Sequence, residues 1–142
     1  MNLANAIRNR RLELKLKDVD VARSSGLSIH EYADIEQHAD EIETAVSMGA
    51  AKRVLHTLEL DVRKLLGLPP LKSELSDISD FLRKAREHQK LSKGQLAKRI
   101  GFDEHTVTSL EEVAGFLDTL PLNVVYELES ALALERGFLV RE

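Results

Sequence analysis

The fold is decided by the segment SKGQLAKRIGFDEHTVTSLE at residues 92–111, which recurs in weaker form as KDVDVARSSGLSIHEYADIE at residues 17–36, 75 positions earlier. Both segments place an alanine four residues before a glycine, Gly26 or Gly101, among apolar residues at helical spacing. An alanine allows two helices to cross closely, and a glycine makes a tight turn without steric cost. The pattern therefore predicts two short helices joined at a tight turn in each half.

Helical patterns extend over the rest of the chain, whereas strand signals are nearly absent. No five-residue alternation of β-branched and polar residues occurs, and aromatic residues make up 4% of the chain. We predict short helices at Asp18–Ser25 and Lys93–Ile100, further helices behind the N-caps Ser28 and Asp103, later helices at about Thr44–Leu58 and Leu122–Leu134, and final turns at Val62–Leu66 and Arg136–Val140. The expected fold is all-α, with about five helices in each copy.

The two copies are expected to form two domains with a short linker between them. Pro69 and Pro70 are adjacent, and proline lacks an N–H and forces the preceding residue out of helical geometry. After a one-residue gap the repeat continues, so that Leu58 matches Leu132. The sequence thus predicts a first domain at 1–68, a linker at 69–72 and a second domain at 73–142.

Composition excludes several classes of protein. The chain has 142 residues and no cysteine, which removes disulfides, thiolate nucleophiles and Cys-ligated zinc. The longest charge-free stretches, 44–51 and 119–126, are far shorter than the ~20 apolar residues of a membrane helix, and the first 20 residues have no secretory pattern. We therefore expect a cytoplasmic protein without a membrane span. The net charge of −4 argues mildly against nucleic acid as a partner.

An arginine precedes each of the two segments by six residues, and a glutamate ends each segment. The pairs are Arg11 with Glu36 and Arg86 with Glu111. With the Ala/Gly spacing, this arrangement resembles the lambda-repressor-like (XRE) family of helix-turn-helix proteins. In that family an arginine of the first helix pairs with a glutamate that closes the third helix. The resemblance implies that the four residues form two structural ion pairs.

The similarity covers residues 3–66 and 78–140, nearly the whole chain. It implies two tandem lambda-repressor-like domains in a small prokaryotic or phage-type regulator that binds duplex DNA to regulate transcription. Copy one departs from the pattern at Ser25, where an apolar residue is expected, and at Lys17, where copy two has the polar cap Ser92. The second domain is therefore the better candidate for DNA binding.

The resemblance also indicates where DNA would be contacted. In this family the third helix faces base edges, and the start of the second helix holds phosphates. Basic residues gather at Arg83–Arg99, where seven bases accompany one acid. The candidate DNA-contact residues are Lys93, Gln95, Lys98, Arg99, His105, Thr106 and Ser109 in copy two, and Lys17 and His30 in copy one. Two tandem copies in one chain could replace the homodimer that single-domain relatives use. The sequence does not decide whether this chain itself forms a homodimer.

Charge on the third helices favours a different partner. The range Glu31–Glu43 contains six carboxylates and no Lys or Arg, and Asp103–Asp118 contains five and no Lys or Arg. Such a surface suits a protein partner, as in an antitoxin or an antagonist of another regulator, because complementary charge steers encounter. The candidate protein-contact residues are Glu31, Asp34, Asp103, Glu104 and Glu112.

Catalysis and metal binding are the weakest interpretations. His30, Asp34 and His38 are spaced i, i+4 and i+8, which would place them on one helix face as metal ligands, but no further ligand is visible. No phosphate loop, nucleophile elbow or paired-carboxylate site occurs. We therefore expect no enzyme, no catalytic residue, no metal and no cofactor.

Overall fold

The structure is a computed structural model that describes residues 2–141, and within them the prediction of an all-α chain is confirmed. The first half contains α1 (Leu3–Glu13), α2 (Asp18–Ser24), α3 (Ile29–Gln37), α4 (Glu41–Thr44), α5 (Met48–Thr57) and α6 (Val62–Leu65). The second half contains α7 (Ile78–His88), α8 (Lys93–Ile100), α9 (Glu104–Glu112), the 3₁₀ helix η1 (Phe116–Thr119) and α10 (Leu122–Ala131). Among these helices none has the length and apolar character needed to cross a bilayer.

Several predicted boundaries are wrong for local reasons. The helix expected at Thr44–Leu58 begins only at Met48, because Ser47 is extended and its side chain accepts a hydrogen bond from the Ala50 N–H, which caps α5. The expected helix Leu122–Leu134 ends at Ala131, because Ala133 has a φ of +57°. The turn expected at Arg136–Val140 is present over residues 136–139.

The two helix pairs, α2–α3 and α8–α9, begin differently, and α2 is one residue shorter than α8. At the start of α8, Ser92 and Gln95 form a capping box in which each side chain accepts a hydrogen bond from the other's backbone N–H. At the start of α2, Lys17 provides no side-chain cap. Both turns use a glycine with positive φ, +71° at Gly26 and +76° at Gly101, a conformation that costs an L side chain energy. α2 therefore lacks both hydrogen bonds of the capping box that begins α8.

The halves meet along a seam formed by residues 46–48 and 120–122. Ser47 and Pro121 form an antiparallel bridge, and the Met48 N–H donates to the Leu120 carbonyl at 2.7 Å. Around the seam α4 packs on α10 and α5 packs on η1. The gap that aligns Leu58 with Leu132 also aligns Ser47 with Pro121, so a residue pairs with its own equivalent, as a two-fold axis requires. The two halves share one buried core.

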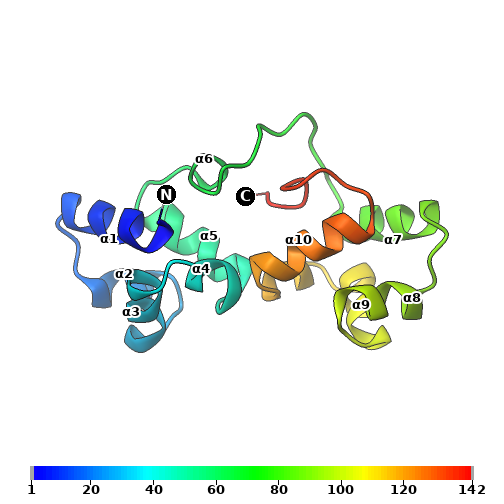
Figure 1. Cartoon of the computed structure of the whole chain (residues 1–142), viewed down its shortest axis with the longest axis horizontal. Coiled ribbons are helices and arrows are strands. Elements are labelled where there is room, and N and C mark those ends of the chain that lie inside the picture. Colours follow the sequence, from blue (N-terminus) through cyan, green and yellow to red (C-terminus); the bar gives the residue numbers. More distant parts are fainter. Residues whose placement is uncertain (1, 142) are drawn as a thin grey trace.

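Figure 1 shows the outcome of this arrangement. The pairs α2–α3 and α8–α9 lie at opposite ends of the molecule and at the same edge, the lower one in the view. The connection between the halves, residues 66–77, contains no helix and arches over the opposite edge. This connection is longer than the linker expected at 69–72.

A buried carboxylate holds the C-terminal segment against α10. Glu129 is 1% exposed, and its two oxygens accept hydrogen bonds from the Gly137 N–H at 2.8 Å and the Leu139 N–H at 2.7 Å. Burial raises the pKa of Glu129, against the opposing effect of the two N–H groups, Arg136 and Arg63. The folded protein therefore holds this proton more tightly than the unfolded chain does.

The raised pKa of Glu129 predicts the direction in which the stability of the fold changes with pH. The stabilisation from a raised pKa is fully present below the unfolded pKa and is lost as pH rises through the folded pKa. We expect the free energy of unfolding of the wild type, minus that of Glu129→Gln, to fall as pH rises from about 4 towards neutrality. Urea melts at several pH values measure it, with the exposed Glu127→Gln on the same helix as the matched control. A difference that does not vary with pH would contradict the raised pKa.

Candidate functional site

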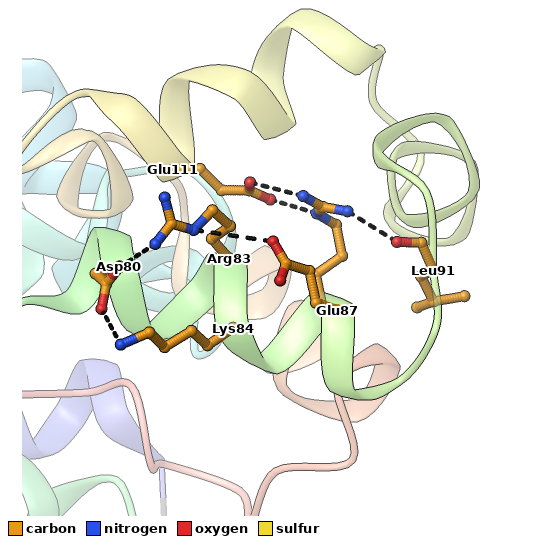
Figure 2. A network of polar contacts seen from close by, with 7 residues as sticks. Asp80, Arg83, Lys84, Glu87, Leu91 and Glu111 are labelled. Atoms are coloured by element: carbon orange, nitrogen blue, oxygen red, sulfur yellow. Dashed lines mark hydrogen bonds and ion pairs between the residues drawn. The ribbon is translucent and has the colours of Figure 1, made fainter.

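A partly buried ion pair fixes α9 against α7. The Arg86 guanidinium donates to both oxygens of Glu111, from Nε at 2.6 Å and from Nη2 at 3.0 Å, and its Nη1 donates to the Leu91 carbonyl at 2.9 Å. Figure 2 shows Glu111 and Leu91, with the hydrogen bonds that they accept drawn as dashed lines. The two side chains are 12% and 3% exposed, and their hydrogen bonds raise the pKa of Arg86. The pair therefore sets the position of α9.

The first half contains the same arrangement. Arg11 donates to both oxygens of Glu36, at 2.6 and 3.0 Å, and to the Leu16 carbonyl at 3.1 Å. Tyr32 is buried beside this pair, and burial followed by the Glu36 carboxylate raises the pKa of its hydroxyl. The structure thus brings together the residues of both pairs, and each pair holds a third helix in place.

Several of the seven basic residues in the range Arg83–Arg99 are paired with carboxylates, so fewer free positive charges remain at the surface than the sequence suggests. Asp80 contacts both Arg83 and Lys84, and the Lys84 Nζ lies 2.8 Å from its carboxylate (Figure 2). The hydrogen bond from Lys84 lowers the pKa of Asp80. Since Arg86 is paired as well, three of the seven bases already have a counter-charge. Lys98 and Arg99 on α8 are exposed and make no ion pair within the described part of the chain.

Other candidate residues of α8 and α9 are engaged in local contacts. The Gln95 side chain belongs to the capping box, and the Thr106 hydroxyl donates to Asp103, which caps α9. These bonds lower the pKa of Asp103. Lys93 is half-buried, with its Nζ 3.3 Å from Thr108 Oγ1. The residues whose exposed side chains stay available are Lys98, Arg99, His105, Glu104 and Glu112, with Ser109 half-buried.

The equivalent surface of the first half is acidic and partly apolar. Lys17, His30 and Asp34 are exposed, and Glu31 closes a capping box with Ser28, which lowers the Glu31 pKa. Among these polar side chains lie Ile29, 38% exposed, and Val19, 41% exposed. We did not predict Val19 as a surface residue. The helix periodicity could have predicted that Val19 is exposed. Val21 and Ala22 are buried, and a residue two positions before Val21 falls on the opposite side of the helix.

The structure corrects the proposed metal-ligand spacing. α3 ends at Gln37, and His38 is its extended C-cap with φ −123° and ψ 125°, so His38 does not continue the helix face of His30 and Asp34. Among residues 2–141, no group of three metal-ligating side chains comes together.

No family model matches this chain, nor does any curated protein or solved structure in the comparisons made.

Proposed function

We propose that the chain is a transcriptional regulator of the lambda-repressor-like type, whose two tandem helix-turn-helix domains bind duplex DNA. The observation that supports this most is the placement of α2–α3 and α8–α9 at one edge of the molecule (Figure 1). The seam between Ser47 and Pro121 relates the two pairs as a two-fold axis relates the subunits of a dimer. A duplex offers successive major-groove faces one helical turn apart, and a two-fold arrangement suits them.

The second domain carries most of the proposed contact. Lys98 and Arg99 are exposed on α8 without an ion-pair partner among residues 2–141, whereas the equivalent helix α2 begins with Asp18 and Asp20. Phosphate contacts provide affinity without sequence information, and base contacts provide specificity. We therefore expect binding that depends steeply on salt and weakly on sequence.

The double substitution Lys98→Gln/Arg99→Gln tests this proposal. We expect weaker duplex binding, and a decrease of about 2 in the slope of log affinity against log salt, since each phosphate contact contributes about 0.9. Fluorescence anisotropy with a labelled duplex over a salt series measures both quantities.

The matched control is Lys64→Gln/Lys72→Gln, which removes the same charge from α6 and the connection, elements at the opposite edge in Figure 1. The control should bind as the wild type does, apart from a small uniform effect of net charge. Equal losses in both double variants would mean that overall charge alone governs binding. An unchanged affinity in Lys98→Gln/Arg99→Gln would remove α8 from the interface.

A second candidate function is contact with a basic protein, and the surface of the first domain favours it. Val19 and Ile29 are exposed there beside Asp18, Glu31 and Asp34. Apolar side chains rimmed by charge are typical of protein interfaces, whereas carboxylates near a phosphate backbone repel. This arrangement would suit an antitoxin or an antagonist of another regulator.

The variant Glu104→Gln/Glu112→Gln distinguishes the two functions, because both carboxylates are exposed on α9. If the ligand is DNA, the loss of repulsion should tighten duplex binding. If the ligand is a basic protein that contacts α9 as well as the first domain, the same loss should slow association and weaken the complex. Anisotropy against a random duplex and association kinetics against a co-purified protein measure the two effects. No change in either would place the binding surface elsewhere.

A further inference from the structure

A cavity of about 1120 Å³ lies between the two halves, on the side of the connection. The end of α5 and α6 form one wall, the connection forms the second, and the C-terminal segment forms the third. Cavities that hold small molecules have volumes of about 300–1,000 Å³. The charged residues around this cavity include Arg63, Lys72, Glu74 and Arg141.

Two arginines in the wall are held by backbone carbonyls. Arg63 donates from Nε to the Pro69 carbonyl at 2.7 Å, and from Nη1 to the Gly137 and Val140 carbonyls at 2.7 and 2.8 Å. Arg141 donates from Nη1 to the Ser73 carbonyl at 2.6 Å. Carbonyls orient a guanidinium but do not neutralise it. Both positive charges therefore remain at the cavity wall.

The second arginine also lies in an unfavourable environment. The Arg141 guanidinium stacks on the Phe138 ring with its central carbon 4.7 Å from the ring centroid, and its Nη2 is closed to solvent without a hydrogen-bond partner among residues 2–141. Burial, and then the neighbouring charge of Arg63, lower the pKa of Arg141, against the opposing effect of the Glu74 carboxylate. A buried donor without a partner and two adjacent like charges both cost free energy. A bound anion would reduce the repulsion between these charges.

Three carboxylates also line the cavity, and each is engaged elsewhere or exposed. Asp61 caps α6 by accepting the Lys64 N–H at 3.0 Å, and Glu59 lies 3.9 Å from Arg10. Glu74 is exposed and forms no ion pair with a residue in 2–141. Neither Arg63 nor Arg141 has a carboxylate within ion-pair distance in that same range. Arg63 and Arg141 thus form no ion pair among residues 2–141, although the Glu74 carboxylate acts on Arg141 from a longer distance.

We propose that this cavity binds a small anionic ligand bearing a carboxylate or phosphate group, held by Arg63 and Arg141 with Lys72 at the rim. Planar guanidinium groups match both oxyanions geometrically, and charge-assisted hydrogen bonds are the strong ones in proteins. The ligand would contact the first half, the connection and the C-terminal segment together, and would stabilise their mutual arrangement. This inference does not depend on DNA binding.

Nuclear magnetic resonance titrations of the full chain with inorganic phosphate and with succinate test the proposal and distinguish the two ligand chemistries. Each is compared with sodium chloride at equal ionic strength, up to about 50 mM, so that screening is the same. We expect at least one of the two anions to give saturable shifts in the amide signals of residues 71–75 and in the Nε–H signals of Arg63 and Arg141. Shifts that do not saturate above the chloride reference, for both anions, would overturn it.

Variants connect the binding to the cavity. Arg141→Gln should weaken the binding of the responding anion by about tenfold, the factor for one lost charge-assisted hydrogen bond. Lys72→Gln, an exposed change that leaves the guanidinium contacts in place, should weaken it less. Lys64→Gln, an exposed cation of α6 outside the cavity lining, should leave the affinity unchanged. Wild-type affinity in both Arg141→Gln and Lys72→Gln would contradict the assignment, as would an equal loss in Lys64→Gln.

Discussion

Replacement of Glu111 by alanine is expected to lower the free energy of unfolding by about 2–4 kcal/mol, because it leaves the guanidinium of Arg86 without its partner at a nearly closed site. The Glu111 side chain is 3% exposed and accepts two hydrogen bonds from Arg86. The loss of one partner costs more than the net value of the pair, since the other charge remains buried. Urea melts measure the change.

Glu112→Ala is the matched control, since it removes the next carboxylate on the same helix, where the side chain is exposed. A surface substitution of this kind changes stability by about 0.5 kcal/mol or less. A Glu111→Ala effect within that range would contradict a structural role for the pair. Glu36→Ala is expected to cost less than Glu111→Ala, because Glu36 and Arg11 are 10% and 15% exposed and solvent screens the remaining charge.

Leu122→Ala is expected to destabilise both halves of the molecule together, by about 2–5 kcal/mol. Leu122 is 1% exposed and follows Pro121 directly at the seam, where α10 packs on α4 of the other half. Since the two halves share one core, the cavity left by the deleted side chain weakens a common unit. Hydrogen exchange of the backbone amides measures the loss of protection in α1–α3 and in α7–α9 separately.

The control is Leu12→Ala, a leucine that is 57% exposed at the end of α1. It should leave protection in both halves within about 0.5 kcal/mol of the wild type. Protection lost in α7–α9 alone would show that the halves unfold independently. That outcome would favour two separate domains joined by a linker over one unit with an internal seam.

Local pattern was sufficient to place much of the secondary structure. The predicted helix Lys93–Ile100 is confirmed residue for residue, and the helix expected from Asp18 ends one residue early. Ser28 and Asp103 begin helices because their side chains accept a backbone N–H of the first turn. The break at Ser47 escaped prediction, because the surrounding apolar residues continue a helical period although the backbone leaves the helix to meet Leu120.

The candidate surfaces were predicted less completely. Sequence charge places seven bases in Arg83–Arg99, but three of these side chains are paired, with Asp80 or with Glu111. A pair three or four residues apart on a helix, such as Asp80 with Lys84, can be read from spacing. The cavity beside Arg63 and Arg141 could not be predicted, since it is formed by segments about 75 residues apart in the chain.

Sequence alone established the helical class and the internal repeat, because helix periodicity, caps and glycine turns are properties of neighbouring residues. Tertiary structure decided how the copies meet. Residues 46–48 and 120–122 show no sequence pattern that indicates a seam, and they meet in a core that both halves share. The placement of α3 and α9 at one edge follows from that seam rather than from the helices themselves. The reason is physical: local hydrogen bonds determine helices, whereas burial of apolar area between distant segments determines their arrangement.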